Sequence, residues 1–334
     1  DWTMNDITAI DYERAVEIAK GVYWVGFFDT QSGLHCNPFL IVDGDEAVVI
    51  DGGSRPDFPT VMMKILQTGI SPQQIRALIY QHYDPDLCAS LPSFEDIIGR
   101  KDLRVISAAA SNMFIRHYTV KSKLEALENI GSRFEFSSGR VLQFIKTPYA
   151  HSQGSHVTFD EASGILFSSD LFGSYGTEWS LYLDLSPECP ACSDFSDCRG
   201  RHIKCPVRDI LKFHEKLMPS EKSLQHALKK VLPVPFTMIA PQHGSIIKGP
   251  KTMCLVIERL AGMKRVGIDA LVEDGYRLTA ERIRERFYRA LLEQNLKLTR
   301  PRKALIDCLL KKRGWHFQAE DLQRSMIHML SGRQ

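Results

Sequence analysis

The sequence predicts an α/β protein, an αββα sandwich in which two β-sheets are packed between two layers of helices. Short apolar runs that end abruptly in polar residues are typical of buried strands that open into loops. Such runs recur along the first 250 residues, and segments with helical spacing of apolar residues separate them. At 334 residues with 44% hydrophobic content, the chain is long enough to bury this core and to carry an appendage.

β-Branched and aromatic residues predict the first strands. The run at 46–50 ends in the turn sequence Asp51-Gly52-Gly53. Asp51 is expected to shape the adjoining loop through hydrogen bonds or to serve as a turn residue. The expected strands are 21–28, 39–42, 46–50, 77–80, 141–145, 156–159, 164–168 and 237–240. The expected helices, which include an amphipathic one at 220–231, are 58–68, 72–76, 111–130, 208–218, 220–231, 251–266 and 278–295.

The strand that ends at Tyr80 is followed by His82-Tyr83-Asp84-Pro85-Asp86. Alternate residues at a strand end would present one imidazole and two carboxylates on one side, close enough to share metal. Three further polar residues follow apolar or β-rich runs of their own, so four strand ends can converge on one edge of a sheet. They are His151, Asp170 and His243.

This order, His-x-Asp-x-Asp and then His, Asp and His, resembles the metallo-β-lactamase superfamily. The chain is most similar to the diiron domain of flavodiiron proteins, in a resemblance carried by 22–26, 37–42, 48–53, 169–173 and 239–244. The resemblance implies two iron ions, because a carboxylate at Asp84 replaces the histidine of many superfamily hydrolases and hard oxygen ligands suit iron or manganese. It also implies the ligand sets: one metal would take His82, Asp84 and His151, the other Asp86 and His243, with Asp170 bridging.

One position departs from the family pattern, because Leu87 stands where a histidine usually follows the second carboxylate. The chain is similar in this to oxygen-binding diiron proteins without a flavodoxin. Few protein ligands on the second metal would leave a position where a small molecule binds, as catalytic zinc sites keep one free. The alternative is a metal-free scaffold.

Four of the eight cysteines are gathered in a loop insertion at 187–206, with the spacing Cys189-x2-Cys192-x5-Cys198-x6-Cys205. Clustered thiolates in a reducing compartment indicate zinc or an iron–sulfur cluster. The spacing matches neither a common zinc ribbon nor the regular ferredoxin run, so zinc and [4Fe–4S] both stay open. Disulfides and a redox-sensing thiol set are the remaining alternatives, and His202 could replace one cysteine.

The composition restricts partners and compartment. A formal charge of +2 gives no electrostatic case for nucleic acid or membrane binding by the whole protein. No run of eighteen apolar residues is present, and the start Asp1-Trp2-Thr3-Met4 lacks the basic and apolar regions of a signal peptide. We therefore expect a cytoplasmic protein.

Residues 1–265 are expected to form the metallo-β-lactamase-like diiron domain and residues 266–334 a helical C-terminal region. The stretches 298–307 and 316–322 resemble the first part of a winged helix, but generic helix formers and no visible recognition helix argue against DNA binding. The region shows no phosphate loop, so we expect no FMN in this chain. An apolar stripe on the expected helix 278–295 requires a cover, and we expect a second copy of the chain to supply it in a homodimer. The stripe consists of Ile283, Phe287, Leu291 and Leu292.

Two function classes follow. In the first, the chain is a non-haem diiron protein that binds or reduces dioxygen or nitric oxide, as a sensor or as an oxidoreductase. It would act with an external electron donor or signalling partner. In the second, it is a dinuclear metallohydrolase, in which a bridging hydroxide attacks an ester or amide. Asp84 weighs against the hydrolase, and the sequence does not decide between sensor and enzyme.

Overall fold

The computed structural model describes residues 10–27, 29, 32–118, 120–192, 197–198, 203–294 and 296–311. The side chains of 197–198, 203–204, 273–279 and 311 lie outside this description. The chain divides into two compact units, Asp1–Gly267 and Ile268–Gln334. Each unit is described by itself.

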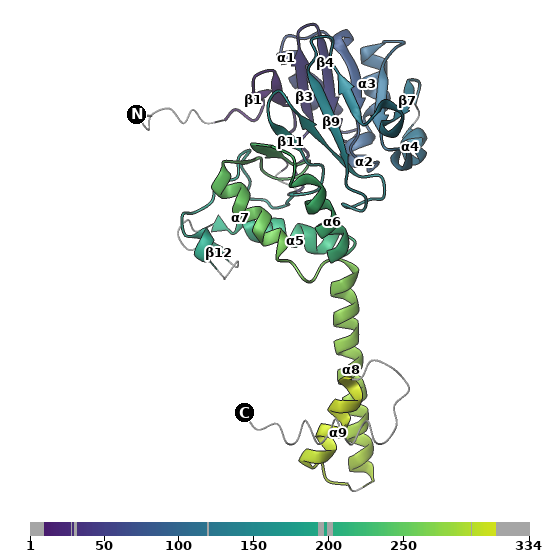
Figure 1. Cartoon of the computed structure of the whole chain (residues 1–334), viewed down its shortest axis with the longest axis vertical. Coiled ribbons are helices and arrows are strands. Elements are labelled where there is room, and N and C mark those ends of the chain that lie inside the picture. The colour runs from purple at the N-terminus through teal and green to yellow at the C-terminus, as the bar shows by residue number, and fades with distance from the viewer. Residues whose placement is uncertain are drawn as a thin grey trace. The chain divides into compact units, whose positions relative to one another are not determined.

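The first unit contains a seven-stranded sheet with the order β1-β2-β3-β4-β5-β6-β7 (Figure 1). Its first four strands pair antiparallel and the pairs from β4 to β7 are parallel. Parallel neighbours deliver their carboxyl ends to the same edge of the sheet, where a site can form. The strands are β1 (Val16–Ala19), β2 (Val22–Trp24), β3 (Phe39–Asp43), β4 (Glu46–Ile50), β5 (Ile75–Ile79), β6 (Arg104–Ser107) and β7 (Lys123–Ala126).

A second, six-stranded sheet has the order β15-β14-β11-β10-β9-β8. Its pairs are antiparallel except β11 with β14, whose carboxyl ends therefore lie together. The strands are β8 (Arg133–Glu135), β9 (Val141–Lys146), β10 (His156–Asp160), β11 (Ile165–Phe167), β14 (Met238–Ala240) and β15 (Ile247–Lys248). A two-stranded hairpin, β12 (Asp197–Cys198) with β13 (Ile203–Lys204), stands apart from both.

Helices cover the outer faces of the two sheets. On the seven-stranded side they are α1 (Phe58–Gln67), α2 (Pro85–Cys88), α3 (Leu91–Ile98) and α4 (Ala109–Ile115). On the six-stranded side they are α5 (Pro206–Leu217), α6 (Glu221–Val231) and α7 (Pro250–Ala261). Short 3₁₀ helices stand at Pro72–Gln74, Arg116–Tyr118, Leu127–Ile130 and Cys189–Ala191.

Three clusters of buried apolar side chains define the layers. One joins the inner faces of the two sheets and includes Phe39 and Phe167, whose ring centroids are 5.1 Å apart. A second packs α1 and α3 on the seven-stranded sheet, and a third packs α5, α6 and α7 on the other. Successive side chains of a strand point to opposite faces, so each strand feeds two clusters. The expected αββα sandwich is confirmed.

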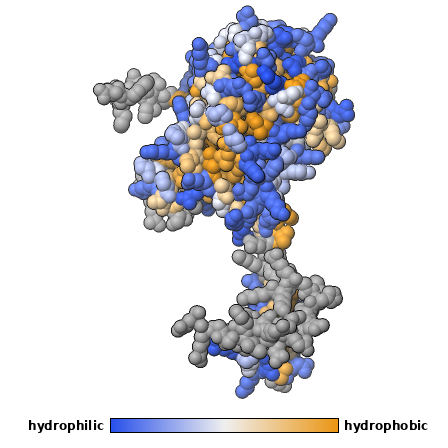
Figure 2. Space-filling model, viewed as in Figure 1, coloured by the Kyte–Doolittle hydropathy of each residue, from blue (hydrophilic) through white to orange (hydrophobic). Residues whose placement is uncertain are grey.

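Hydrophilic residues cover much of the visible surface of the first unit, with apolar residues in smaller areas between them (Figure 2).

The single helix expected at 111–130 is wrong. The chain forms α4, a 3₁₀ turn and then the strand β7, which pairs parallel with β6. Arg104 of β6 and Glu125 of β7 form an ion pair at 2.6 Å. Pairing with a neighbouring strand outweighs local propensity here, a contact that lies outside any sequence window. The helix expected at 72–76 is likewise a 3₁₀ turn of three residues, because Ile75 already pairs with β4.

The second unit contains α8 (Ile268–Glu293) and α9 (Arg300–Lys311). Arg284 of α8 binds Asp307 of α9 with Nε and Oδ1 3.0 Å apart. Among the described residues, no helix is long and apolar enough to cross a membrane.

Candidate metal centre

The segment after β5 places the first three candidate ligands, but not as a continued strand. Asp84 has extended backbone angles and stands at the N-cap of α2, with Pro85 at the first helical position. Proline favours extended backbone in the residue before it and is well suited to begin a helix. The expected strand-end alternation of His82, Asp84 and Asp86 is therefore wrong: His82 precedes a helix and the two carboxylates belong to its start.

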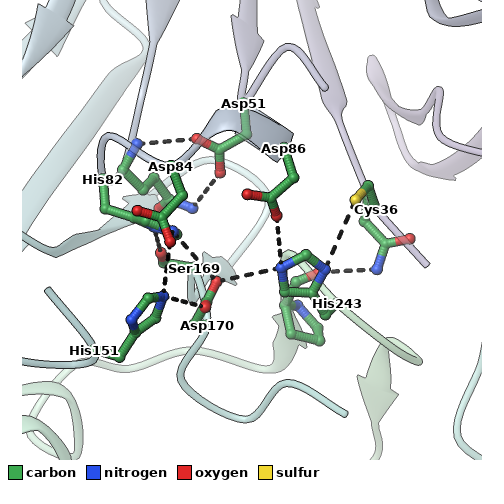
Figure 3. A network of polar contacts seen from close by, with 12 residues as sticks. Cys36, Asp51, His82, Asp84, Asp86, His151, Ser169, Asp170 and His243 are labelled. Atoms are coloured by element: carbon green, nitrogen blue, oxygen red, sulfur yellow. Dashed lines mark hydrogen bonds and ion pairs between the residues drawn. The ribbon is translucent and has the colours of Figure 1, made fainter. Parts of the chain in front are cut away.

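The other candidates come from the ends of neighbouring elements. Asp170 follows β11 and His243 follows β14, the two parallel strands of the second sheet. His151 lies in the loop between β9 and β10. All six predicted residues meet in one network at the ends of the strands (Figure 3).

One half of the network gathers two imidazoles and two carboxylates. The Nε2 atom of His151 lies 2.9 Å from Oδ2 of Asp170 and 3.3 Å from Oδ2 of Asp84. The Nε2 atom of His82 lies 3.7 Å from Asp84 and 3.8 Å from Asp170. Its other ring nitrogen, Nδ1, is 2.9 Å from Oγ of Ser169, which fixes the direction of the ring. His82, His151 and Asp170 each offer one ligand atom, and these three atoms lie within 4.8 Å of one another.

The other half is built on His243. Its Nε2 atom lies 3.0 Å from Oδ2 of Asp86 and 3.7 Å from Oδ1 of Asp170. Asp170 therefore stands between the two halves, with Oδ2 toward His151 and Oδ1 toward His243 (Figure 3). Cys36, Asp86 and His243 form a second group whose ligand atoms lie within 4.8 Å.

Opposite charges shift the pKa values of these residues. Burial alone would raise the pKa of Asp170, but the adjacent imidazoles, His82 first, hold it well below its usual range. Burial would lower the pKa of His151, but hydrogen bonds with Asp170 and Asp84 raise it to about 10. The pKa of Asp84 is lowered too, because its hydrogen bonds with the histidines outweigh burial. The neighbouring imidazoles thus stabilise the ionised forms of Asp84 and Asp170.

Two buried atoms at the centre of the network lack a hydrogen-bond partner in the part of the chain that the structure describes. They are Nε2 of His82 and Oδ1 of Asp170. A buried polar atom without a partner is costly, so such an atom calls for an explanation such as an ion. Mixed imidazole and carboxylate donors suit iron or manganese. The residues present fit a two-metal group.

Asp51, which the sequence predicts to shape its adjoining loop, supports the segment that carries His82. Asp51 accepts bonds from the backbone N and the side-chain Nε2 of Gln81, at 2.9 and 3.0 Å. Burial raises the pKa of Asp51 to about 7 despite these bonds. Because Gln81 precedes His82, this carboxylate holds the loop that carries the first ligand.

Sequence reasoning missed the residues behind His243. Cys36 is buried, and its Sγ atom lies 3.8 Å from Nδ1 of His243. The amide of Asn37 donates to the carbonyls of Pro241 and Gly244 at 2.9 and 2.7 Å. The sequence carries no local signal for this role, because the burial of Asn37 and its partners depend on contacts about 200 positions away.

The cysteine loop is described in part. Cys189 and Cys192 share one 3₁₀ turn, closed by a bond from the Cys192 backbone N to the Cys189 carbonyl at 3.2 Å. Cys198 lies in β12 opposite Ile203 of β13, and its side chain is outside the described ones. Cys205 is buried at the N-cap of α5. His202 lies outside the described residues.

The fold, with its candidate ligands at the strand ends, places the chain in the metallo-β-lactamase-like class. Residues 34–244, more than half of the chain, match the model of the ODP family beta lactamase. The chain belongs to this family.

The chain is also similar to known proteins. It is 24% identical over 247 residues to the type A flavoprotein fprA of Rhodobacter capsulatus, covering 70% of this chain and 52% of that protein. A structure titled peroxy diiron species of chemotaxis sensor ODP has a TM-score of 0.60 and 22% identity, covering 78% of this chain and 98% of that one. Rubredoxin oxygen:oxidoreductase from Desulfovibrio gigas has a TM-score of 0.63 and 18% identity, covering 74% and 61%. The chain spans only 35% and 52% of the length of the first two curated relatives.

Proposed function

We propose that this chain is a non-haem diiron protein that binds or reduces dioxygen or nitric oxide. The observation that carries the proposal is Asp170, a buried carboxylate directed at histidines of both halves, with one oxygen that makes no hydrogen bond to the described residues. Names of relatives support it: one is a diiron chemotaxis sensor and another an oxygen:oxidoreductase. The chemistry supplied by two iron ions would be the binding and reduction of small oxidants.

The residues proposed to hold the iron ions follow the two halves of the network. His82, Asp84 and His151 would hold the first ion, Asp86 and His243 the second, and Asp170 would bridge them. Ser169 orients the His82 ring from behind, and such outer partners fix which ring nitrogen is free for metal.

Metal analysis and a spectrum test the proposal. Wild-type protein purified without chelators is expected to contain iron, and His82→Ala to lose a large part of it. Reduced protein exposed to oxygen should develop near-ultraviolet or visible absorption. Zinc in place of iron, with hydrolysis of a generic phosphodiester and no oxygen response, would favour a dinuclear hydrolase.

For the loop at 187–206 we propose a second metal site formed by Cys189, Cys192, Cys198 and Cys205. The turn that joins the first two cysteines supports this assignment, because two cysteines separated by two residues are a common ligand pair of zinc and iron–sulfur sites. Anaerobic purification followed by counts of iron and acid-labile sulfide separates the alternatives. About four sulfides per chain would indicate [4Fe–4S] and an electron relay, whereas zinc without sulfide would indicate a structural loop and favour a sensor.

We also propose that residues 1–265 form the metal-binding domain and residues 266–334 a helical region through which two copies associate in the cytoplasm. Ile283, Phe287 and Leu292 of α8 are each more than a third exposed within the described structure, and an apolar helical stripe requires a cover. Truncation after Val266 should convert a dimer to a monomer in light scattering and leave the iron content intact. A truncated protein that stays dimeric would contradict the assignment.

A further inference from the structure

His35 joins the second half of the metal network to a group of aromatic rings. Its carbonyl oxygen accepts a hydrogen bond from Nδ1 of His243 at 3.3 Å, while Nε2 of His243 faces Asp86. Its own ring stacks on Trp179, with the ring centroids 4.6 Å apart and the planes inclined by 20°. This separation is at the short end of the range of about 4.5–7 Å that aromatic pairs prefer. A candidate iron ligand and an indole ring are therefore linked through a single residue.

Two hydrogen bonds fix the ring of His35. Its Nδ1 atom accepts from the backbone N of Asp29 at 3.1 Å, and its Nε2 atom donates to the carbonyl of Gly176 at 2.8 Å. The residue is fully buried. Gly176 lies three positions before Trp179, so the second bond also holds the segment that carries the indole. The fold thus keeps the imidazole and the indole in contact.

Trp179 contacts two further aromatic rings. Its ring centroid lies 5.4 Å from that of Tyr12 and 6.0 Å from that of Trp24. The rings of Tyr12 and Trp24 are also 6.0 Å apart. Trp24 is fully buried, whereas Trp179 and Tyr12 are partly exposed. We call these three rings with His35 the aromatic cluster; it extends from the neighbourhood of His243 to the solvent.

The chemistry of the aromatic cluster suits the transfer of single electrons. Indole and phenol rings are among the side chains that lose one electron most readily, and electrons pass best between rings in contact and across hydrogen bonds. Trp24 is the less favourable donor of the two indoles, because Nζ of Lys64 lies 4.3 Å from its ring centroid. An ammonium group is attracted to the face of a neutral indole but repels one that has lost an electron. Trp179 is therefore the indole that gives up an electron more easily.

We propose that Trp179 and His35 form an electron relay between the protein surface and the iron ion held by His243. The inference rests on the proposed diiron function. Reduction of dioxygen to water takes twice as many electrons as a pair of ferrous ions supplies, so further electrons must reach the site through the protein. The relay offers such a path, because it leads from a partly exposed indole through a stacked imidazole and one hydrogen bond to His243.

Each passage along the relay moves one electron. Trp179 loses the electron and becomes an indole radical cation, and ferric iron at His243 gains it and becomes ferrous. The radical cation then takes one electron from an external one-electron donor at the surface, and that donor is oxidised. The indole keeps its proton throughout, and the protons that form water come from the solvent.

The test withholds the external donor, so that the missing electron stays visible as a radical. Reduced, iron-loaded protein freed of excess reductant is mixed with oxygen, frozen at set times and measured by electron paramagnetic resonance. We expect an organic radical whose spectrum narrows when the protein contains ring-deuterated tryptophan, which identifies an indole. Zinc-loaded protein should give no radical, because zinc does not change its oxidation state.

Variants at Trp179 locate the radical. Trp179→Phe keeps a ring against His35, but this ring is much harder to oxidise, so the indole signal should fall several-fold. Trp179→Tyr should restore a radical with the spectrum of a tyrosine. Tyr182→Phe is the matched control, because Tyr182 is a partly buried tyrosine outside the aromatic cluster, and it should leave the signal unchanged.

His35→Gln tests the path between Trp179 and His243. Its amide keeps an acceptor for Asp29 and a donor for Gly176, and its main-chain carbonyl still holds His243, but the stacked ring is lost. The iron content should stay at the wild-type level, while the radical should form several-fold more slowly.

Two results would overturn the relay: a wild-type radical yield in Trp179→Phe, or wild-type protein that binds iron and reduces oxygen without forming an indole radical. Wild-type protein that binds no iron, or whose iron does not respond to oxygen or nitric oxide, would contradict the proposed function instead. Iron content and the visible spectrum of the same samples show which of the two has failed.

Discussion

The Nε2 atom of His243 lies 3.0 Å from Oδ2 of Asp86, while its Nδ1 atom lies 3.3 Å from the carbonyl oxygen of His35. The two ring nitrogens thus have different tasks: one faces the candidate metal position, and the other is held by backbone. Among the described residues Asp86 forms an ion pair only with His243, whereas the first half has two histidines and Asp84. The two halves should therefore lose metal separately.

Asp86→Ala tests this separation. It removes the carboxylate that faces His243 and leaves His82, Asp84 and His151 in place, so we expect about half of the bound iron to be lost. Metal analysis of dialysed protein measures it. Asp96→Ala, which removes a carboxylate exposed on α3, is the control and should keep the wild-type iron content. Complete loss of iron from Asp86→Ala would show that the halves bind as one unit.

Leu87 is a core residue, although it directly follows the candidate ligand Asp86. Its side chain is fully buried in the cluster beneath α1 and α3. Leu87→Ala should therefore lower the free energy of unfolding by about 2–5 kcal/mol through the cavity it leaves. Leu66→Ala, at a position that is 47% exposed on α1, is the matched control and should cost much less. Urea unfolding of metal-free protein measures both, and equal costs would contradict this account.

The order of the site residues could be predicted because each follows an apolar run that reads as a strand. Asp170 and His243 illustrate this, since β11 and β14 are short, apolar and parallel. The sequence could not show that Asp84 and Asp86 begin a helix, although Pro85 between them was a signal. Nor could it show β7, whose pairing with β6 is a contact between residues about twenty positions apart.

The partners of His243 lay beyond sequence reasoning for a different reason. Cys36 and Asn37 are about 200 positions away from it, and only the packing of the two sheets brings them together. A local pattern identifies a residue that a strand delivers to a site. It does not identify residues such as Cys36 and Asn37, which contact His243 from a distant part of the sequence.

Lys64 predicts a pH dependence of stability. Its ammonium group is buried, donates to the carbonyls of Tyr12 and Gly26 and lies 4.3 Å from the ring centroid of Trp24. Burial lowers its pKa from 10.5 to about 8. Between these values the unfolded chain holds more protons than the folded one, so the free energy of unfolding rises as pH increases from about 8 to 10.5.

Comparison of wild type with Lys64→Met isolates this contribution, because other groups that titrate in the same range are common to both proteins. The difference in unfolding free energy between them should change in favour of wild type as pH rises through that interval. Urea unfolding at several pH values measures it. A difference that stays constant from pH 7 to 11 would mean that Lys64 titrates as it does in the unfolded chain.

Asn37 gives the last prediction, because it joins three parts of the molecule. Its Oδ1 atom accepts from Nε1 of Trp24 at 2.8 Å, and its Nδ2 atom donates to the carbonyls on both sides of the Gln242-His243 pair. Asn37→Ala leaves these three buried groups without their partner, at a cost of about 1–3 kcal/mol for each group that water cannot reach.

Because the freed carbonyls flank His243, Asn37→Ala should also lower the iron content. Asn112→Ala is the control: it removes a half-buried amide on α4 that donates to the carbonyls of Ser107 and Glu125, and it should leave the iron content unchanged. Asn37→Asp separates the two effects. Its carboxylate keeps an acceptor for Trp24 but faces the carbonyls of Pro241 and Gly244 with no donor, so it should lose at least as much iron as the alanine variant. Metal analysis beside thermal unfolding measures both, and an Asn37→Asp protein with wild-type iron content would show that the His243 loop needs no support from this amide.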